Sequence, residues 1–139
     1  MGKINAGRVI VGGLLAGLVV NISEAVLNLL VVAQEMEDAL KARNLPPLGT
    51  APIIGFVVLA FVLGIVTVWL YAAIRPRFGA GAGTAAIGGL AVWFFAYFYG
   101  AAALGLMELF PIKLLTVVTL WGLPEIVLAS IAGAWAYKE

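Results

Sequence analysis

Cysteine and histidine are absent from this 139-residue chain, and charged residues make up only 11% of it. Without cysteine there can be no disulfide, thiolate nucleophile or iron–sulfur ligand. Without histidine, the usual ligand of haem and catalytic zinc is missing, so we expect no cofactor and no metal centre. The net charge of +1 provides no basic stripe, which argues against nucleic acid as a partner.

Hydrophobic residues account for 64% of the chain, which is not the composition of a soluble domain. A helix needs about 20 apolar residues to cross the hydrocarbon core of a bilayer. Four such runs fill nearly the whole length, so the sequence predicts an all-α polytopic membrane protein, a four-transmembrane-helix bundle forming one membrane domain, 1–139. The helices are expected, to within a few residues, at about 7–33, 52–74, 84–109 and 112–137, with an outer interfacial segment at 34–51.

The basic residues predict the orientation, because short loops rich in lysine and arginine stay in the cytoplasm. Five basic residues fall on the side of the two termini and three on the other side, so both termini are expected to be cytoplasmic. The two groups are Lys3, Arg8, Arg75, Arg77 and Lys138, against Lys41, Arg43 and Lys113.

Two further patterns mark the cytoplasmic boundary. The stretch Arg75-Pro76-Arg77-Phe78, which is followed by glycines, predicts a flexible basic turn between the second and third helices. Aromatic rings with a polar tip favour the headgroup level. Trp69 with Tyr71, and Trp135 with Tyr137, are therefore expected at that level.

A faint internal repeat is also visible. Val11-Gly12-Gly13-Leu14 resembles Ile87-Gly88-Gly89-Leu90 at an offset of 76 residues, and Trp69-Leu70-Tyr71 resembles Trp135-Ala136-Tyr137 at an offset of 66. Two helix pairs related by an axis along the membrane normal would produce such a pattern, as in transporters with parallel repeats. Short matches in a sequence rich in glycine and aromatics also arise by chance.

Two carboxyl side chains, Glu24 and Glu125, lie deep inside the predicted spans, where an ionisable group costs about 2.5–3.5 kcal/mol. Glu24 shares one face of the first helix with Gly17, Asn21 and Asn28. Glu125 lies in the fourth helix on a stripe of small residues, which allow helix backbones to approach closely. We therefore expect these two helices to pack together with both carboxyl groups facing inward.

The helical rise of about 1.5 Å per residue places both glutamates roughly 20–24 Å above the cytoplasmic charges, and Tyr97 in the third helix at a similar depth. No basic residue lies at this depth. At least one carboxyl group should therefore hold a proton, or a cation should be bound. Pro124 frees the carbonyl oxygen of Leu120, which is a further possible cation ligand.

A structural role is the alternative for these polar residues. A protonated glutamate bonded to Asn21, to Asn28 or to a backbone carbonyl also holds helices together, at about 1 kcal/mol or less per bond. The aromatic residues of the third helix are expected to serve packing or lipid contact. Ser23 and Ser130 have no histidine base and no lysine at their depth, so we expect no enzyme.

Two family resemblances follow from short stretches. Residues 69–79, Trp-Leu-Tyr-Ala-Ala-Ile-Arg-Pro-Arg-Phe-Gly, and residues 125–135, Glu-Ile-Val-Leu-Ala-Ser-Ile-Ala-Gly-Ala-Trp, are similar to a family of small, uncharacterised bacterial four-helix membrane proteins. That resemblance implies a bacterial inner membrane and no particular function. Gly12-Gly13 ahead of Glu24 resembles the first helix of small multidrug-resistance transporters, whose four-helix chains carry one essential carboxylate there; the likeness covers only that helix.

The sequence thus predicts a small transporter or conduction protein that binds a proton or a cation near mid-membrane. The residues expected to bind it are Glu24, Asn21, Asn28, Glu125 and Tyr97. Four helices enclose little volume, so besides the lipid bilayer we expect a homo-oligomer or a larger membrane complex as partner. The alternative is a non-catalytic accessory or lipid-binding scaffold subunit.

Overall fold

The computed structural model describes residues 3–137, and within that range the chain is helical without any strand. Lys138, which was counted for the orientation, lies outside the described residues. Four helical stretches are long and apolar enough to cross a membrane. They are Ala6–Val31, Thr50–Phe78, Ala82–Leu106 and Ile112–Ala136.

Two of these four spans contain a short π-helix, a wide turn that is rare and often lies at a functional site. The first and third spans are therefore composite. The first consists of α1 (Ala6–Val26) and η1 (Leu27–Val31), and the third of α4 (Ala82–Trp93), η2 (Phe94–Phe98) and α5 (Tyr99–Leu106). The second and fourth are the single helices α3 (Thr50–Phe78) and α6 (Ile112–Ala136), and a short helix, α2 (Ala33–Lys41), lies in the segment between the first two spans.

The segment predicted as a flexible basic turn is helical instead. Helix α3 continues through Pro76 and ends only before Gly79, whose backbone N–H donates to the Arg75 carbonyl oxygen at 2.8 Å. Proline has a backbone angle that suits a helix and removes a single N–H donor. Gly79 adopts a φ of 86°, which a residue with a side chain rarely does, so the helix ends there.

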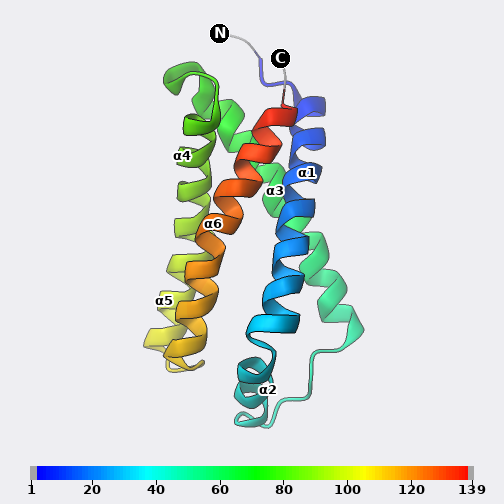
Figure 1. Ribbon diagram of the computed structural model, residues 1–139, viewed down its shortest axis with the longest axis vertical. Coiled ribbons are helices and arrows are strands. Elements are labelled where there is room, and N and C mark those ends of the chain that lie inside the picture. Colours follow the sequence, from blue (N-terminus) through cyan, green and yellow to red (C-terminus); the bar gives the residue numbers. More distant parts are fainter. Residues whose placement is uncertain (1–2, 138–139) are drawn as a thin grey trace.

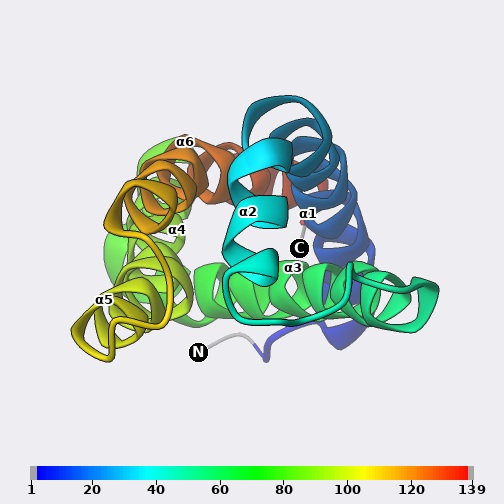
Figure 2. The same ribbon diagram turned by 90° about the horizontal axis from the view of Figure 1, so that it is seen from below.

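The four spans form a closed ring in which α1 packs on α3, α3 on α4, α4 on α6, and α6 on α1. Figure 1 shows both described ends of the chain at one end of the molecule, here called the terminal end. Helix α2 and the turn between α5 and α6 lie at the opposite end, here called the far end. Viewed from the far end, α2 crosses the middle of the ring (Figure 2).

Glycine sets the close contact between α1 and α3. A Cβ atom on Gly17 would lie 2.7 Å from the Cα atom of Phe61, and one on Gly64 would collide with the backbone of Gly13 and Gly17. Without side chains at these positions, the two backbones touch directly, which is how helices associate where no hydrophobic force favours their contact. Gly13 and Gly17 therefore act as a packing motif.

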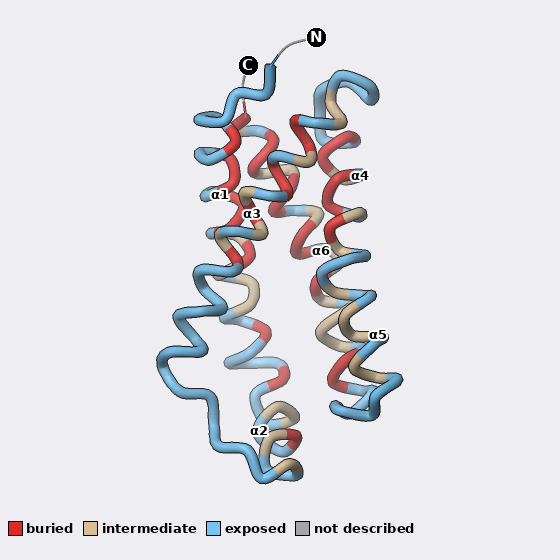
Figure 3. Tube along the Cα trace, turned by 180° about the vertical axis from the view of Figure 1, so that it is seen from behind, coloured by how far each residue is buried: buried red, intermediate tan, exposed pale blue. Residues whose placement is uncertain are grey.

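Burial is uneven along the ring. Figure 3 shows the buried residues gathered toward the terminal end and the middle. On α3, residues 50–59 are all exposed, and α5 has no buried residue. The helices are therefore tightly packed at the terminal end, and toward the far end the first half of α3 separates from the ring.

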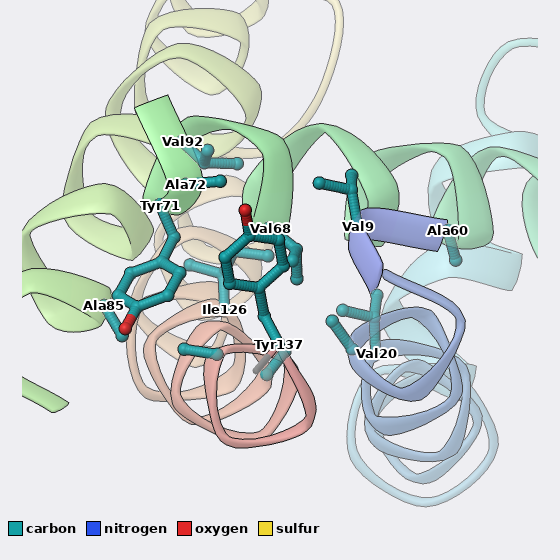
Figure 4. Close-up of a cluster of buried hydrophobic side chains, with 13 residues drawn as sticks. Val9, Val20, Ala60, Val68, Tyr71, Ala72, Ala85, Val92, Ile126 and Tyr137 are labelled. Carbon is teal, nitrogen blue, oxygen red and sulfur yellow. The ribbon is translucent and has the colours of Figure 1, made fainter. Parts of the chain in front are cut away.

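Tyr71 and Tyr137 belong to the buried core, and their expected position at the headgroup level stays a prediction. Both are only 3% exposed, and their rings meet edge to face with centroids 6.1 Å apart (Figure 4). Each hydroxyl group is satisfied by a backbone N–H donor, which removes the need for water at the polar tip. Trp69 and Trp135 are 51% and 72% exposed, as expected of rings that face lipid or headgroups.

The two tyrosine hydroxyl groups are bound in a reciprocal pattern. Tyr137 Oη accepts from the backbone N–H of Asn5, and Tyr71 Oη accepts from that of Gly81, each at 3.3 Å. Asn5 and Gly81 are 76 residues apart, and the tyrosines are 66 apart, which are the two offsets of the repeat. Each helix pair thus binds the start of the other pair, as two-fold symmetry requires.

Candidate functional site

Glu125 lies near the middle of α6 and is only 4% exposed. Tyr97 Oη donates a hydrogen bond to its Oε1 atom at 2.6 Å. The other oxygen, Oε2, is buried and makes no hydrogen bond of standard length among residues 3–137. A buried carboxyl group therefore has one oxygen held and one oxygen available inside an apolar helix bundle.

The π-helix η2 and a glycine on α6 together bring Tyr97 to this position. Within η2 and beside it, Phe95 and Tyr99 are 72% and 65% exposed, whereas Tyr97 is turned inward against the core. Its ring lies over Gly122, where an added Cβ would be 2.5 Å from the ring atom Cε1. Gly122 thus provides the space that the Tyr97 ring occupies beside Glu125.

Across the helix contact, α1 supplies the remaining polar neighbours of Glu125. The Ser23 and Glu24 side chains lie close enough to interact electrostatically with the Glu125 carboxyl group. Ser23 Oγ also accepts a hydrogen bond from Trp121 Nε1 at 2.9 Å, which joins α1 to α6 one helical turn from Glu125. The structure therefore contains the expected contact between the first and fourth spans, with both glutamates at it.

Glu24 is partly buried and is held by Asn28 from the next helical turn. Asn28 Nδ2 donates to both Glu24 Oε2 and the Glu24 backbone oxygen, each at 2.8 Å. Asn28 lies in η1 and is exposed. Glu24 and Asn28 therefore form the open side of the site, and Glu125 and Tyr97 form its closed side.

Asn21 is the one predicted site residue that the structure places elsewhere. Its Nδ2 atom donates to the Gly17 carbonyl oxygen at 3.0 Å and to that of Val57 on α3 at 3.3 Å. Residues three apart on a helix differ in direction by about 60°. That difference directs the short amide of Asn21 to α3, while Glu24 faces Glu125.

The backbone oxygen freed by Pro124 is also not beside the carboxyl groups. Pro124 is exposed, and Leu120, whose carbonyl oxygen it leaves unbonded, is 62% exposed. A helical carbonyl points toward the nitrogen four residues later, so this oxygen lies on the outward face of α6. Glu125 lies on the buried face.

Ser23 and Trp121 were not predicted as parts of the site, although the sequence contains a signal for each. Trp121 precedes Glu125 by four residues and so shares its face of the helix. Ser23 is adjacent to Glu24 in the sequence. The two π-helices have no recognisable signal in the sequence, because the widened turn depends on the packing around it.

No lysine or arginine faces this cluster from within its own helices. In the first span and in α6, the described basic residues are Arg8 and Lys113, both in the first turns. Glu24 follows Arg8 by 16 residues and Glu125 follows Lys113 by 12, or roughly 24 Å and 18 Å along the helix. The two carboxyl groups therefore have hydroxyl, amide and indole neighbours but no cationic one.

With four helices of this length and composition, the chain belongs to the class of multi-pass membrane proteins. No protein-family model, no curated protein and no solved structure matches it.

Proposed function

We propose that this protein is a small transporter or conduction protein of the bacterial inner membrane that binds a proton or a cation between Glu24 and Glu125. The observation that carries the proposal is the Glu125 carboxyl group, 4% exposed, held by Tyr97 through one oxygen and facing Glu24 without a basic partner. Such a group is costly inside a membrane and is functional by default.

The chemistry follows from the charges. Two carboxylates that lie close together in a low-dielectric interior repel each other, so a proton or a cation must neutralise at least one of them. With Tyr97 donating to Oε1, the position left for that proton or cation is Glu125 Oε2, on the side of Glu24. Asn28 fixes the Glu24 carboxyl group in place and so limits where the second oxygen ligand can lie.

The proposal includes a membrane-spanning four-helix bundle with both termini in the cytoplasm. Both described ends lie at the same end of the molecule, as an even number of spans requires (Figure 1). Described basic residues at that end, Lys3, Arg8, Arg75 and Arg77, are accompanied by no described acidic residue. The far end carries both signs of charge, so the excess of positive charge favours a cytoplasmic terminal end.

The proposal also includes an origin by duplication of a two-helix unit. The reciprocal bonds of Tyr71 and Tyr137, at positions related by the two repeat offsets, support it. A pseudo-two-fold axis along the membrane normal would then pass between these two tyrosines. A homo-oligomer fits the exposed apolar stretch 50–59 of α3, which faces lipid or a second copy.

The alternative, a scaffold subunit without transport, is favoured by a different set of contacts. Ser130 Oγ donates to the Ala85 carbonyl oxygen at 2.7 Å, and Trp93 Nε1 donates to that of Thr119 at 2.8 Å. Both bonds join neighbouring helices and involve no carboxyl group. Polar residues in this protein thus also hold helices together, as the scaffold role requires.

Flux measurements in proteoliposomes separate the two functions. Wild-type protein is expected to carry protons or monovalent cations under an imposed potential, and Glu125→Gln or Glu24→Gln should reduce the flux to that of protein-free liposomes. The matched control is Glu108→Gln, which makes the same change at the end of the third span, where the chain turns toward α6.

A wild-type flux equal to that of empty liposomes would overturn the transport proposal. So would glutamine variants that conduct like the wild type. Purification in native lipid then tests the scaffold alternative, which requires a stable complex with other proteins rather than free copies of this chain.

A further inference from the structure

An apolar layer lies beyond the Glu24–Glu125 site, toward the far end of the molecule. Its buried members come from η1, α2, α6 and the residue between η1 and α2, and its partly buried members pack around them. We call this layer the far-end cluster; it comprises Leu27, Val32, Ala39 and Leu114, with Met36, Phe110, Val117, Val118 and Trp121.

The far-end cluster begins one helical turn from the site. Leu27 follows Glu24 by three residues, and Trp121 precedes Glu125 by four. Trp121 belongs to both the site and the far-end cluster, because its ring packs in the cluster while its Nε1 atom donates to Ser23. The far-end cluster therefore lies between the site and the far end along the first span and α6.

Helix α2 packs on this layer through Ala39 and Met36, and two contacts join α2 and the residues after it to α6 and the turn before it. Lys113 Nζ lies 3.1 Å from Glu35 Oε1, and the Arg43 guanidinium carbon lies 4.9 Å from the centre of the Phe110 ring. Between these ties lies a cavity of about 220 Å³, lined by Asp38 and Leu114 among others. This hollow is open to the surface along α2 and the start of α6.

The ion pair between Lys113 and Glu35 is formed at neutral pH. A backbone hydrogen bond at Glu35 and the neighbouring Lys113 hold the pKa of the Glu35 carboxyl group below its usual range. Glu35 therefore keeps its charge to a lower pH than an isolated glutamate does. The pair is exposed, so it stabilises the contact between α2 and α6 only weakly.

The chain on both sides of α2 allows the helix to move as a unit. Val32, with φ of −114° and ψ of 10°, interrupts the helix between η1 and α2. After α2, residues 42–49 are not helical. Segments of this kind absorb the backbone rotation in hinge motions, so α2 can swing without unfolding α1 or α3.

Among residues 3–137, the terminal end has no comparable element. There Tyr71, Tyr137 and the glycine contacts close the ring with buried residues, and every helix is anchored by backbone contact (Figure 4). We propose that α2 is a hinged gate, latched by the Glu35–Lys113 ion pair, that controls access to the Glu24–Glu125 site from the far end. Its role as a gate for transport rests on the proposed function, whereas its movement does not.

Thiol accessibility tests the gate without any measurement of transport. Because the wild-type chain has no cysteine, Ser23→Cys introduces a single reactive thiol beside Glu125. In nanodiscs, the rate of its modification by a charged, membrane-impermeant thiol reagent reports how often the site opens. Ser130→Cys, in the buried contact with Ala85, monitors general loosening of the fold and should stay unreactive in every background.

Breaking the latch should raise the rate at position 23. Lys113→Gln is expected to accelerate modification by up to about fivefold, the range that one exposed ion pair allows. Glu35→Lys places two positive charges together and should act more strongly, and adding Lys113→Glu to it should restore the wild-type rate. Lys41→Gln is the matched control, because it breaks the Glu37–Lys41 pair within α2 and leaves the latch intact.

An unchanged rate in Lys113→Gln and Glu35→Lys overturns the gate, as does equal acceleration by Lys41→Gln. Acceleration that the charge swap reverses supports it. If the latch variants open the site but liposomes show no flux, the gate stands and the transport proposal fails. If flux depends on both glutamates but the rate of thiol modification is the same in the latch variants and the wild type, the transport proposal stands and the gate fails.

Discussion

The two helix pairs of this protein begin alike and then differ. Near the terminal end, each pair brings a glycine against its partner helix: Gly13 meets Ile65 in α3, and a Cβ on Gly89 would lie 3.0 Å from the Cα atom of Val127 in α6. Farther along, α3 separates from α1, whereas α5 stays beside α6 and Tyr97 fills the space between the third span and α6.

The difference explains why the site lies where it does. Where glycines let two backbones touch, no side chain can enter the contact, so no ligand can be bound there. Large side chains such as Tyr97 and Trp121 keep the helices farther apart, and helix separation depends on the residues at the contact. The polar site therefore occupies the part of the ring that glycine does not close.

The largest expected effect comes from placing a side chain in the glycine contact of the first pair. Gly64→Ala should lower the free energy of unfolding by about 3 kcal/mol, because its Cβ meets backbone atoms that cannot move aside. Unfolding by denaturant in detergent micelles measures the change. Gly55→Ala in the same helix, with no atom within 4 Å of its Cβ, should be neutral or stabilising by up to about 1 kcal/mol.

Equal destabilisation by the two alanine variants would show that the α1–α3 contact is not glycine-dependent, and the comparison of the two pairs would then fail.

Gly122→Ala should lower the free energy of unfolding by less than Gly64→Ala does, but it should abolish the flux. Gly122→Ala pushes the Tyr97 ring away from Glu125 and should cost about 2 kcal/mol through overpacking. Proteoliposome flux should fall to the level of Glu125→Gln. Gly100→Ala, which has open space around its Cβ, is the control in the same helix pair as Tyr97. A Gly122→Ala variant with normal flux would remove Tyr97 from the site.

The smallest expected effect tests whether the two helix pairs are equivalent at their tyrosine hydrogen bonds. Tyr71→Phe and Tyr137→Phe each remove one 3.3 Å hydrogen bond and should each cost about 0.5 kcal/mol, since bonds of this kind contribute modestly. Thermal unfolding of both variants, with the exposed Tyr99→Phe as a neutral control, tests whether the two losses match. Losses that differ by more than about 1 kcal/mol would argue against equivalent positions.

Hydropathy predicted the helices, and side-chain spacing predicted that the two carboxyl groups face one helix contact, because hydropathy and spacing are local properties of the sequence. A run of about 20 apolar residues has few structural solutions, and the small residues around Glu125 predicted the contact with the helix of Glu24. The prediction of a turn at 75–78 was wrong, because Pro76 lies in the last turn of α3, where one lost hydrogen bond costs little.

By itself, the sequence predicted four membrane-spanning helices, roughly where they lie, and two acidic residues inside them with no basic residue at their depth. The tertiary structure decided the rest: that Tyr97 and not Asn21 bonds to the acidic cluster, that Tyr71 and Tyr137 are buried, and that α2 covers the far end. These outcomes depend on which faces of different helices meet, and on π-helical turns that shift those faces. No local pattern contains that information.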